Sequence, residues 1–367
     1  MRIGGGQGWT QGAASAALAI GVSVATATWA EAACTPGSAG VAPGSTVTCD
    51  LITNEQDAPH GYGTGTQTGI TIDVLDNASL TGSTIPADAS HGIWIGDAVI
   101  RNGVGASIVG YQSGVTAAIG SLNLTNKGTI TGTNGIGISA NSDVTLTNQA
   151  GSVILGATDG VVSTAGTITV DNAGTITGTG AAAIDAFGDV TVINRAGGVI
   201  AGGTRGIFSR GGNITIDNSG SITSTGGVAT VSTGFDSIKV INRAGASISG
   251  NVAAFNAVDI DNSGDIGGVT GTRVKVVNTA TGTIGAISAL GDSDIANFGT
   301  VTTDVNTVGN GILVNHAGGR ILGFVRGLSG YSVINQAGAY MGAVVATNSS
   351  VDNSGTIGVG VGLSGNS

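Results

Sequence analysis

Apolar and polar residues alternate along short segments of this chain, and one such segment recurs. Residues 168–178 read Ile-Thr-Val-Asp-Asn-Ala-Gly-Thr-Ile-Thr-Gly, and residues 190–202 and 214–223 follow a closely similar pattern. Alternation with a period of two indicates a strand with one buried face. An Asn followed closely by Gly indicates a tight turn. The pattern therefore predicts repeated strand–turn–strand units.

The Asn of each unit marks the length of the repeat. Successive copies lie 16 to 24 residues apart, and 227 residues over 11 gaps give an average of about 20.6. Repeats of this length are typical of solenoids, whose units bury their apolar faces only by stacking. Weaker copies at Asn77 and Asn102 extend the series toward the N-terminus. The repeated residues are Asn126, Asn148, Asn172, Asn194, Asn218, Asn242, Asn262, Asn278, Asn297, Asn315, Asn335 and Asn353.

Two kinds of solenoid have a period near this length. A leucine-rich repeat also carries a periodic Asn but needs a dense Leu framework, whereas Ile, Val, Thr and Ser fill the strands here. Each unit also holds a third short strand, as at 135–139, 160–163 and 206–209. We therefore predict an all-β fold over residues 70–367. It is a right-handed parallel β-helix (β-solenoid) of about 14 turns, each of roughly 16–25 residues with three short strands.

The parity of the strand assigns the faces of the repeated unit. Ile168, Val170 and Asn172 share one face, and Thr169 and Asp171 share the other. The repeated Asn is therefore predicted to point inward at a corner, about 4.8 Å from the Asn of the next turn. Because buried amides must be paired, such a column would form a hydrogen-bonded ladder. The alternative is an outward turn Asn in the left-handed conformation. Neither interpretation makes these residues catalytic.

The N-terminal quarter differs from the rest. Residues 1–32 resemble a secretory signal peptide: Arg2 is followed by a mostly apolar segment, and Ala30-Glu31-Ala32 fits a cleavage site. A transmembrane anchor and a lipid-anchored Cys34 are the weaker alternatives. The two cysteines, Cys34 and Cys49, predict a local disulfide in an exported chain. All four prolines lie before residue 87, so residues 33–69 are interpreted as an irregular cap.

Charged residues near the turns suggest a second column. Asp precedes the repeated Asn at Asp171, Asp217 and Asp261, and Arg follows it at Arg195 and Arg243. By parity these side chains lie on one outer edge, which predicts an alternating Asp–Arg column along the solenoid. The alternative is a set of unrelated solvated charges.

Little in the sequence indicates chemistry. The net charge of −10 and pI near 4.4 argue against a nucleic-acid partner. His60, His91 and His316 are far apart in the sequence, and no catalytic or metal-binding motif occurs. The one carboxylate cluster is Asp259, Asp261 and Asp265, and Asp261 is the ordinary Asp of the repeat. We therefore expect no enzyme, no cofactor and no metal.

The aromatic residues could mark a glycan site, but we expect most of them to stack in the core. The residues concerned are Trp94, Tyr111, Phe187, Phe208, Phe235, Phe255 and Phe324.

The signal-like start, the Cys34–Cys49 cap and the repeated Ile-x-Asn-x-Gly-x-Ile-x-Gly-like turns resemble the passenger domain of a type V autotransporter of Gram-negative bacteria. Its motifs are shared with secreted β-helices of the filamentous-haemagglutinin kind. The resemblance implies export, display at the cell surface or outside the outer membrane, and a role as an adhesin or virulence-associated surface protein. It also implies an outer-membrane β-barrel translocator as partner, and a glycan or protein on a host or surface as ligand.

The family's C-terminal barrel is absent from these 367 residues, which end while the repeat is still running. We interpret the chain as a passenger fragment. The alternative is a structural protein that self-associates end to end into filaments or a surface layer, because an open solenoid end exposes an unpaired ladder edge.

Overall fold

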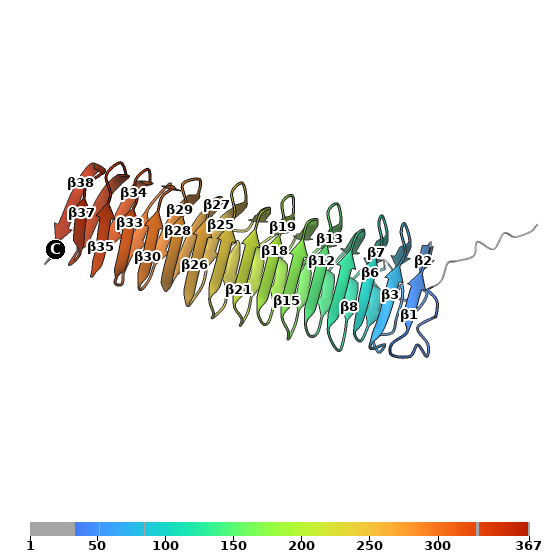
Figure 1. Ribbon diagram of the computed structural model, residues 1–367. Helices are drawn as coiled ribbons and strands as arrows, with labels where there is room; N and C mark the ends of the chain where they lie inside the picture. The colour runs from blue at the N-terminus through green and yellow to red at the C-terminus, as the bar shows by residue number, and fades with distance from the viewer. Residues whose placement is uncertain (1–33, 51, 84, 328–329, 366–367) are drawn as a thin grey trace, which may run out of the picture. The chain divides into compact units, whose positions relative to one another are not determined.

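The computed structural model describes residues 34–50, 52–83, 85–327 and 330–365. The described chain is an all-β parallel β-solenoid of about 14 turns, drawn as a stack of strands in Figure 1. The predicted signal peptide, residues 1–32, lies outside the described residues. Among the described residues, no helix is long and apolar enough to cross a membrane.

The first strand of each turn belongs to one 15-stranded parallel sheet. From Asn102 to Asn353 every strand of this sheet ends in the repeated Asn, so the turn sequence sets where each strand stops. The strands are β1 (Thr46–Cys49), β3 (Ile70–Val74), β6 (Ala98–Asn102), β9 (Leu122–Asn126), β12 (Val144–Asn148), β15 (Ile168–Asn172), β18 (Val190–Asn194), β21 (Ile214–Asn218), β24 (Ile238–Asn242), β26 (Ala257–Asn262), β28 (Arg273–Asn278), β30 (Ser293–Asn297), β33 (Gly311–Asn315), β35 (Tyr331–Asn335) and β37 (Ser350–Asn353).

The second and third strands of each turn belong to a second parallel sheet. The second strands are β2 (Ile52–Asn54), β4 (Ser79–Thr81), β7 (Ser107–Gly110), β10 (Thr129–Gly132), β13 (Val153–Gly156), β16 (Thr175–Gly178), β19 (Val199–Gly202), β22 (Ser221–Ser224) and β31 (Thr300–Val301). The third strands are β5 (His91–Ile95), β8 (Ser113–Ala117), β11 (Ile136–Ala140), β14 (Val161–Ser163), β17 (Ala182–Ala186), β20 (Arg205–Ser209), β23 (Val231–Thr233) and β32 (Val305–Thr307). A short 3-10 helix, η1 (Pro86–Asp88), precedes β5.

After Asn242 the turns become shorter, and the second and third strands run together in most of them. Strand β25 pairs with β22 through its first residues and with β23 through its last. A register shift between Ile248 and Asn251 replaces the corner. Three separate strands per turn therefore describe the N-terminal half better than the C-terminal half. The merged strands are β25 (Ser247–Ala253), β27 (Asp265–Gly271), β29 (Thr283–Ala289), β34 (Arg320–Gly327), β36 (Tyr340–Thr347) and β38 (Thr356–Ser364).

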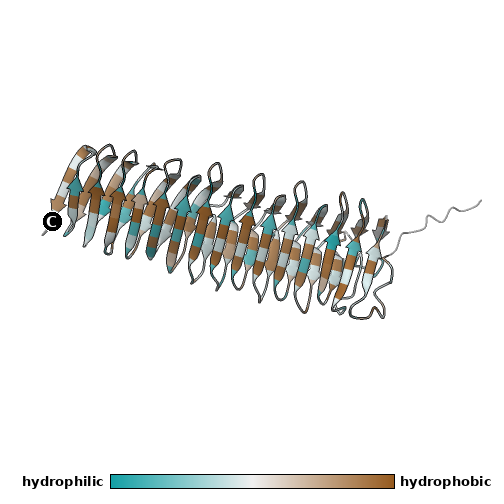
Figure 2. Ribbon diagram, viewed as in Figure 1, coloured by the Kyte–Doolittle hydropathy of each residue, from teal (hydrophilic) through white to brown (hydrophobic). Residues whose placement is uncertain are grey.

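The core is a narrow continuous column of Ile, Val, Leu and Ala from all three strand sets. In β15, Ile168, Val170 and Asn172 are buried while Thr169 is exposed, as the parity of the sequence predicts. Figure 2 shows the resulting alternation of apolar and polar bands along the strands. Stacking is the source of stability, because one turn alone cannot enclose its apolar face.

Stacking begins inside the segment interpreted as a cap. Strand β1 pairs with β3, and β2 pairs with β4, in the same parallel arrangement as later turns. Residues 34–45 and 55–69 form no strand of their own, apart from isolated bridges. The first turn therefore has solenoid strands joined by irregular, proline-containing connections.

Candidate functional site

A hydrogen-bonded amide column runs along the interior of the solenoid. The Nδ2 of each repeated Asn donates to the Oδ1 of the Asn in the next turn, and all twelve links from Asn102 to Asn353 measure 2.7–3.0 Å. The same nitrogen reaches a backbone carbonyl of the second strand one turn on, as from Asn172 to Val199 at 3.3 Å. From Asn102 to Asn335 these side chains are at most 1% exposed, whereas Asn353 is exposed. The column is structural, because its donors and acceptors are used by the fold.

The column has a defined N-terminal end. Val74 and then Cys49 occupy the Asn position in the two turns before Asn102. With no amide on Val74, the buried Oδ1 of Asn102 has no hydrogen-bond donor among the described residues. Asn77 is not a member of the column, contrary to the expectation from its sequence. It is exposed and lies in a turn with φ of +60°.

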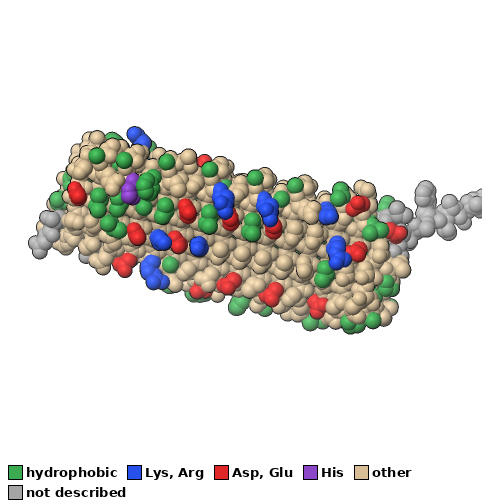
Figure 3. Space-filling model, viewed as in Figure 1, with side chains coloured by type: hydrophobic (Ala, Val, Ile, Leu, Met, Phe, Trp, Pro, Cys, Tyr) green, Lys and Arg blue, Asp and Glu red, His purple; other side chains and the backbone are tan. Residues whose placement is uncertain are grey.

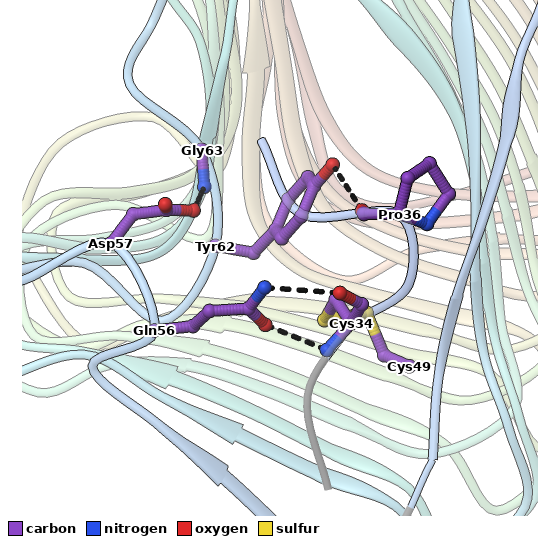
Figure 4. Close-up of a disulfide and its surroundings, with 7 residues drawn as sticks. All are labelled: Cys34, Pro36, Cys49, Gln56, Asp57, Tyr62 and Gly63. Carbon is purple, nitrogen blue, oxygen red and sulfur yellow. Dashed lines mark hydrogen bonds between the residues drawn. A yellow bond between two sulfur atoms is a disulfide. The ribbon is translucent and has the colours of Figure 1, made fainter. Parts of the chain in front are cut away.

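The Cys34–Cys49 disulfide is confirmed, with both residues buried. Figure 4 shows its surroundings: the Gln56 amide accepts from the backbone N–H of Cys34 at 2.6 Å and donates to its carbonyl at 3.0 Å. Tyr62 donates its hydroxyl to the carbonyl of Pro36. Burial, and then the Asp57 carboxylate, raise the pKa of Tyr62 to about 12. A buried structural disulfide is typical of a protein in an oxidising, extracytoplasmic compartment.

The predicted Asp–Arg column is broken into separate pairs. Arg195 contacts Asp171 of the preceding turn through two nitrogens at 2.5 and 2.6 Å, and Arg243 contacts Asp217 in the same way. No ion pair joins Arg195 to Asp217 within the described part of the chain. The hydrogen bonds from Arg243 lower the pKa of Asp217. The cause is geometric: each Arg lies just beyond the corner and reaches only the previous turn. In Figure 3 the basic groups stand beside acidic ones on this face.

A more buried ion pair, which the sequence analysis missed, lies on the third strands. Arg210 binds Asp185 through two nitrogens at 2.7 and 3.1 Å, although the two residues are 25 positions apart. Asp185 is only 8% exposed. Burial raises the pKa of the neighbouring Asp159, whose carboxylate accepts from the backbone N–H of Ala182. The sequence signal for this pair is the recurrence of third strands, which places residues of successive turns side by side.

The cluster Asp259, Asp261 and Asp265 is divided between two elements. Asp259 and Asp261 lie on β26, and Asp265 begins β27. Asp259 stands in register with Lys239 and Lys275, and the latter ammonium is 4.0 Å from its carboxylate. The sequence alone did not bring these lysines beside Asp259, because they belong to adjacent turns.

The expectation that most aromatic side chains stack in the core is wrong. Phe235 and Phe255 are 72% and 71% exposed, and Phe187 and Phe324 are also exposed. Phe187 directly follows the inward Ala186 of β17, so its parity is outward. Phe208 lies between the inward Ile207 and Ser209, with the Arg205 guanidinium 4.4 Å from its ring centre. These phenylalanines therefore belong to the surface, whereas Tyr62 and Tyr331 are fully buried.

Two histidines that are 31 positions apart come together near the N-terminal end. The rings of His60 and His91 have centres 5.3 Å apart, and Trp94 lies against both. The backbone N–H of His91 donates to Nδ1 of His60 at 3.2 Å. Burial, and then the neighbouring His60, lower the pKa of His91 to about 4. The third histidine, His316, lies elsewhere and stacks on Phe298 with ring centres 3.9 Å apart.

No family model matches this chain, and neither a curated protein nor a solved structure is similar to it.

Proposed function

We propose that the chain is an exported β-solenoid passenger, displayed at the surface of a Gram-negative bacterium, where it acts as an adhesin or interaction rod. The observation that carries this proposal is the unbroken stack of turns joined by the amide column from Asn102 to Asn353. Such a stack resists bending, because every turn is bonded to the next by a backbone ladder and by a buried side chain.

The long surface of the solenoid supports a binding role. Equivalent positions repeat about every 4.8 Å along the strands' stacking direction, so weak contacts can be multiplied along one ligand or one cell surface. The outer positions vary from turn to turn, as in the first sheet, where Thr215, Lys239, Asp259 and Lys275 follow one another in register. A constant scaffold with variable outer residues is suited to recognition.

The export part of the proposal rests on two observations. The buried disulfide is typical of oxidising compartments, and residues 1–32 have the pattern of a secretory signal. Passage across the outer membrane would require a β-barrel translocator, either on the same polypeptide or on a separate one. A glycan or protein of a host or another surface would be the ligand.

Surface display can be tested with an epitope tag inserted after Gly227. This glycine is exposed in the loop between β22 and β23, and a Cβ added to it would meet no atom within 4 Å. Antibody should label intact cells of the producing bacterium, whereas a tagged periplasmic protein should be labelled only after the outer membrane is permeabilised. Labelling of the solenoid only after permeabilisation would contradict surface display.

The binding role needs a separate measurement. Cells with and without the gene are compared for attachment to host cells and to immobilised extracellular material. Loss of attachment on deletion, and its return on complementation, are expected for an adhesin. Equal attachment by both strains, with the tag fully accessible, would leave display intact but contradict the adhesin role.

A further inference from the structure

One corner near the N-terminal end is much longer than its neighbours. Nine residues, 82–90, separate β4 from β5, whereas two residues separate β7 from β8 and three separate β10 from β11. The solenoid does not need this extra length, because the next turns close the same corner without it.

Hydrogen bonds hold the described residues of the long corner, 82–83 and 85–90. Ser83 donates to the carboxylate of Asp88 at 2.5 Å, and the buried Ser90 donates its hydroxyl to the carbonyl of Ser83. The carbonyl of Ser90 accepts the N–H of Gln112 in the next turn at 2.8 Å. Ala89 has φ of +46°, a left-handed conformation that costs a non-glycine residue about 1 kcal/mol or more. Strain of this kind persists only where the surroundings impose it.

This corner forms one wall of a groove of about 500 Å³. None of the lining residues is Asp, Glu, Lys or Arg, although the whole chain carries a net charge of −10. The lining side chains that matter below are those of His91, Tyr111, Gln112, Thr116, Asn134 and Thr158. An uncharged groove of hydroxyl, amide and aromatic groups suits a ligand that is itself uncharged and rich in hydroxyls.

The polar groups come from three successive corners of the solenoid. Gly110, Gly132 and Gly156 pair in register at the ends of their strands, but the corners that follow contain two, three and four residues and do not keep that register. The N–H of Asn134 donates to the carbonyl of Tyr111, and that of Thr158 donates to the carbonyl of Gly135. The side chains of Gln112, Asn134 and Thr158 are exposed in these corners and line the same groove. They offer amide and hydroxyl groups beside the ring of Tyr111, whose face can pack against the apolar face of a sugar.

His91 adds a positioned neutral imidazole to the groove. It is 8% exposed, and its ring lies against the rings of both His60 and Trp94. The hydroxyl of Thr116 lies 3.0 Å from Nδ1, and the hydrogen bonds of the ring within the described chain use only that nitrogen. Burial keeps the imidazole uncharged at neutral pH, so its other nitrogen is left to serve an uncharged hydroxyl.

We propose that this groove binds a neutral saccharide, lying across the three successive corners that carry Gln112, Asn134 and Thr158 and bounded by Pro86 and Ala89 of the long corner. The proposal deepens the adhesin function and rests on it, since it names the class of ligand. An acidic polysaccharide is disfavoured because the groove supplies no cation for its carboxylates.

The test is a titration of the purified chain, observed by saturation-transfer NMR and calorimetry. The probes are cellohexaose, maltohexaose and an α-mannan oligosaccharide as neutral saccharides, and hexagalacturonate as the acidic one. At least one neutral probe should bind. The variants Asn134→Ala and Thr158→Ala, both at exposed positions, should each weaken that binding at least fivefold. Asn134→Ala should leave the thermal unfolding curve unchanged, whereas Thr158→Ala also removes a hydrogen bond from the Asp159 carboxylate.

The matched control is Thr204→Ala. Thr204 occupies the equivalent position two turns beyond Thr158, two residues after the end of the second strand, and does not line the groove. It should bind the neutral probe like the unaltered chain. Binding of no neutral probe, equal weakening by Thr204→Ala, or tighter binding of hexagalacturonate would overturn the proposal. If the groove variants bind no worse while gene deletion still abolishes attachment, the groove assignment fails and the adhesin function stands.

Discussion

Cys49 and Asn102 occupy the same column of the first sheet, two turns apart, with Val74 between them. One cysteine of the disulfide, Cys49, therefore occupies the column that carries the amide ladder in later turns. The ladder itself begins at Asn102, whose buried Oδ1 accepts no hydrogen bond from the residues that the structure describes. Covalent and hydrogen-bonded stabilisation thus follow one another along the same edge of the core.

An interior rung should matter more than the terminal rung. Asn172→Val leaves the buried Oδ1 of Asn194 without its donor, an effect of about 1–3 kcal/mol. Asn102→Val should cost less than about 1 kcal/mol, because the Oδ1 of Asn126 still accepts from the backbone N–H of Gly128. Urea unfolding of the two variants makes the comparison. Equal losses would contradict a directional ladder.

Reduction of the disulfide should loosen the N-terminal turns and spare the distant ones. The crosslink closes a segment of 15 residues, which corresponds to roughly 3 kcal/mol. Since each turn contacts only its neighbours, hydrogen exchange should accelerate in β1 and β3 but not in β30 or β33. The double variant Cys34→Ala/Cys49→Ala should behave like the reduced chain and be insensitive to reductant. Uniform loss of protection would contradict this local effect.

The stability of the N-terminal end should fall in acid because of His91. Its pKa is about 4 in the folded chain and near 6.5 when unfolded, so the unfolded state binds more protons between these values. The contribution of His91 to the free energy of unfolding is fully present above pH 6.5. It falls by about 3 kcal/mol as the pH drops from 6.5 toward 4. Burial also lowers the pKa of His60, so His60 adds to the loss of stability in acid. The Asp57 carboxylate raises the pKa of His60 and thereby reduces that addition.

His91→Gln serves as the control for this acid effect. It removes the titrating group and keeps a polar side chain, so the difference in unfolding free energy between the unaltered chain and the variant should shrink or change sign toward pH 4. Carboxylates elsewhere titrate in both proteins and cancel from the difference. A difference independent of pH would contradict the role of His91.

Two Asp–Arg pairs should differ because their burial differs. Asp171 is 34% exposed as a side chain and Asp185 only 11%. Arg195→Ala should leave the melting temperature nearly unchanged at physiological salt, whereas Arg210→Ala leaves a buried carboxylate unpaired and should lower it by roughly 2 °C or more. Arg195→Asp tests whether the Asp–Arg column is discontinuous. A fall in melting temperature as large as that of Arg210→Ala would show that Arg195 is coupled to more than Asp171.

Small-angle scattering across a concentration series tests the shape and the self-association alternative together. Fifteen strands in the first sheet give a stack of about 65 Å or somewhat more. A monomeric elongated particle of that length is expected. Fibres of uniform width that grow with concentration would instead favour the structural, self-associating alternative.

The sequence by itself determined the repeated features of this protein. Period-two alternation assigned Ile168, Val170 and Asn172 to one buried face, and the Asn–Gly turns placed the ends of the first strands. These features follow from the sequence because they depend on residues a few positions apart, and each of the many turns states the pattern again. The Cys34–Cys49 disulfide could also be predicted from the sequence, since the chain has no other cysteine.

The tertiary structure alone decided what meets across turns. It brings His60 to His91 and pairs Asp185 with Arg210. Because Val74 precedes Asn102 in its column, the Oδ1 of Asn102 finds no donor in the described part of the chain. The tertiary structure also leaves Phe235 and the other exposed phenylalanines on the surface. After Asn242 it merges the second and third strands of most turns into one. These outcomes depend on register and on the length of each corner, which vary from turn to turn. The sequence signal for the proposed saccharide groove was the long segment between the strands that end at Thr81 and begin at His91. That segment could be recognised as the wall of a groove only once the neighbouring turns were stacked beside it.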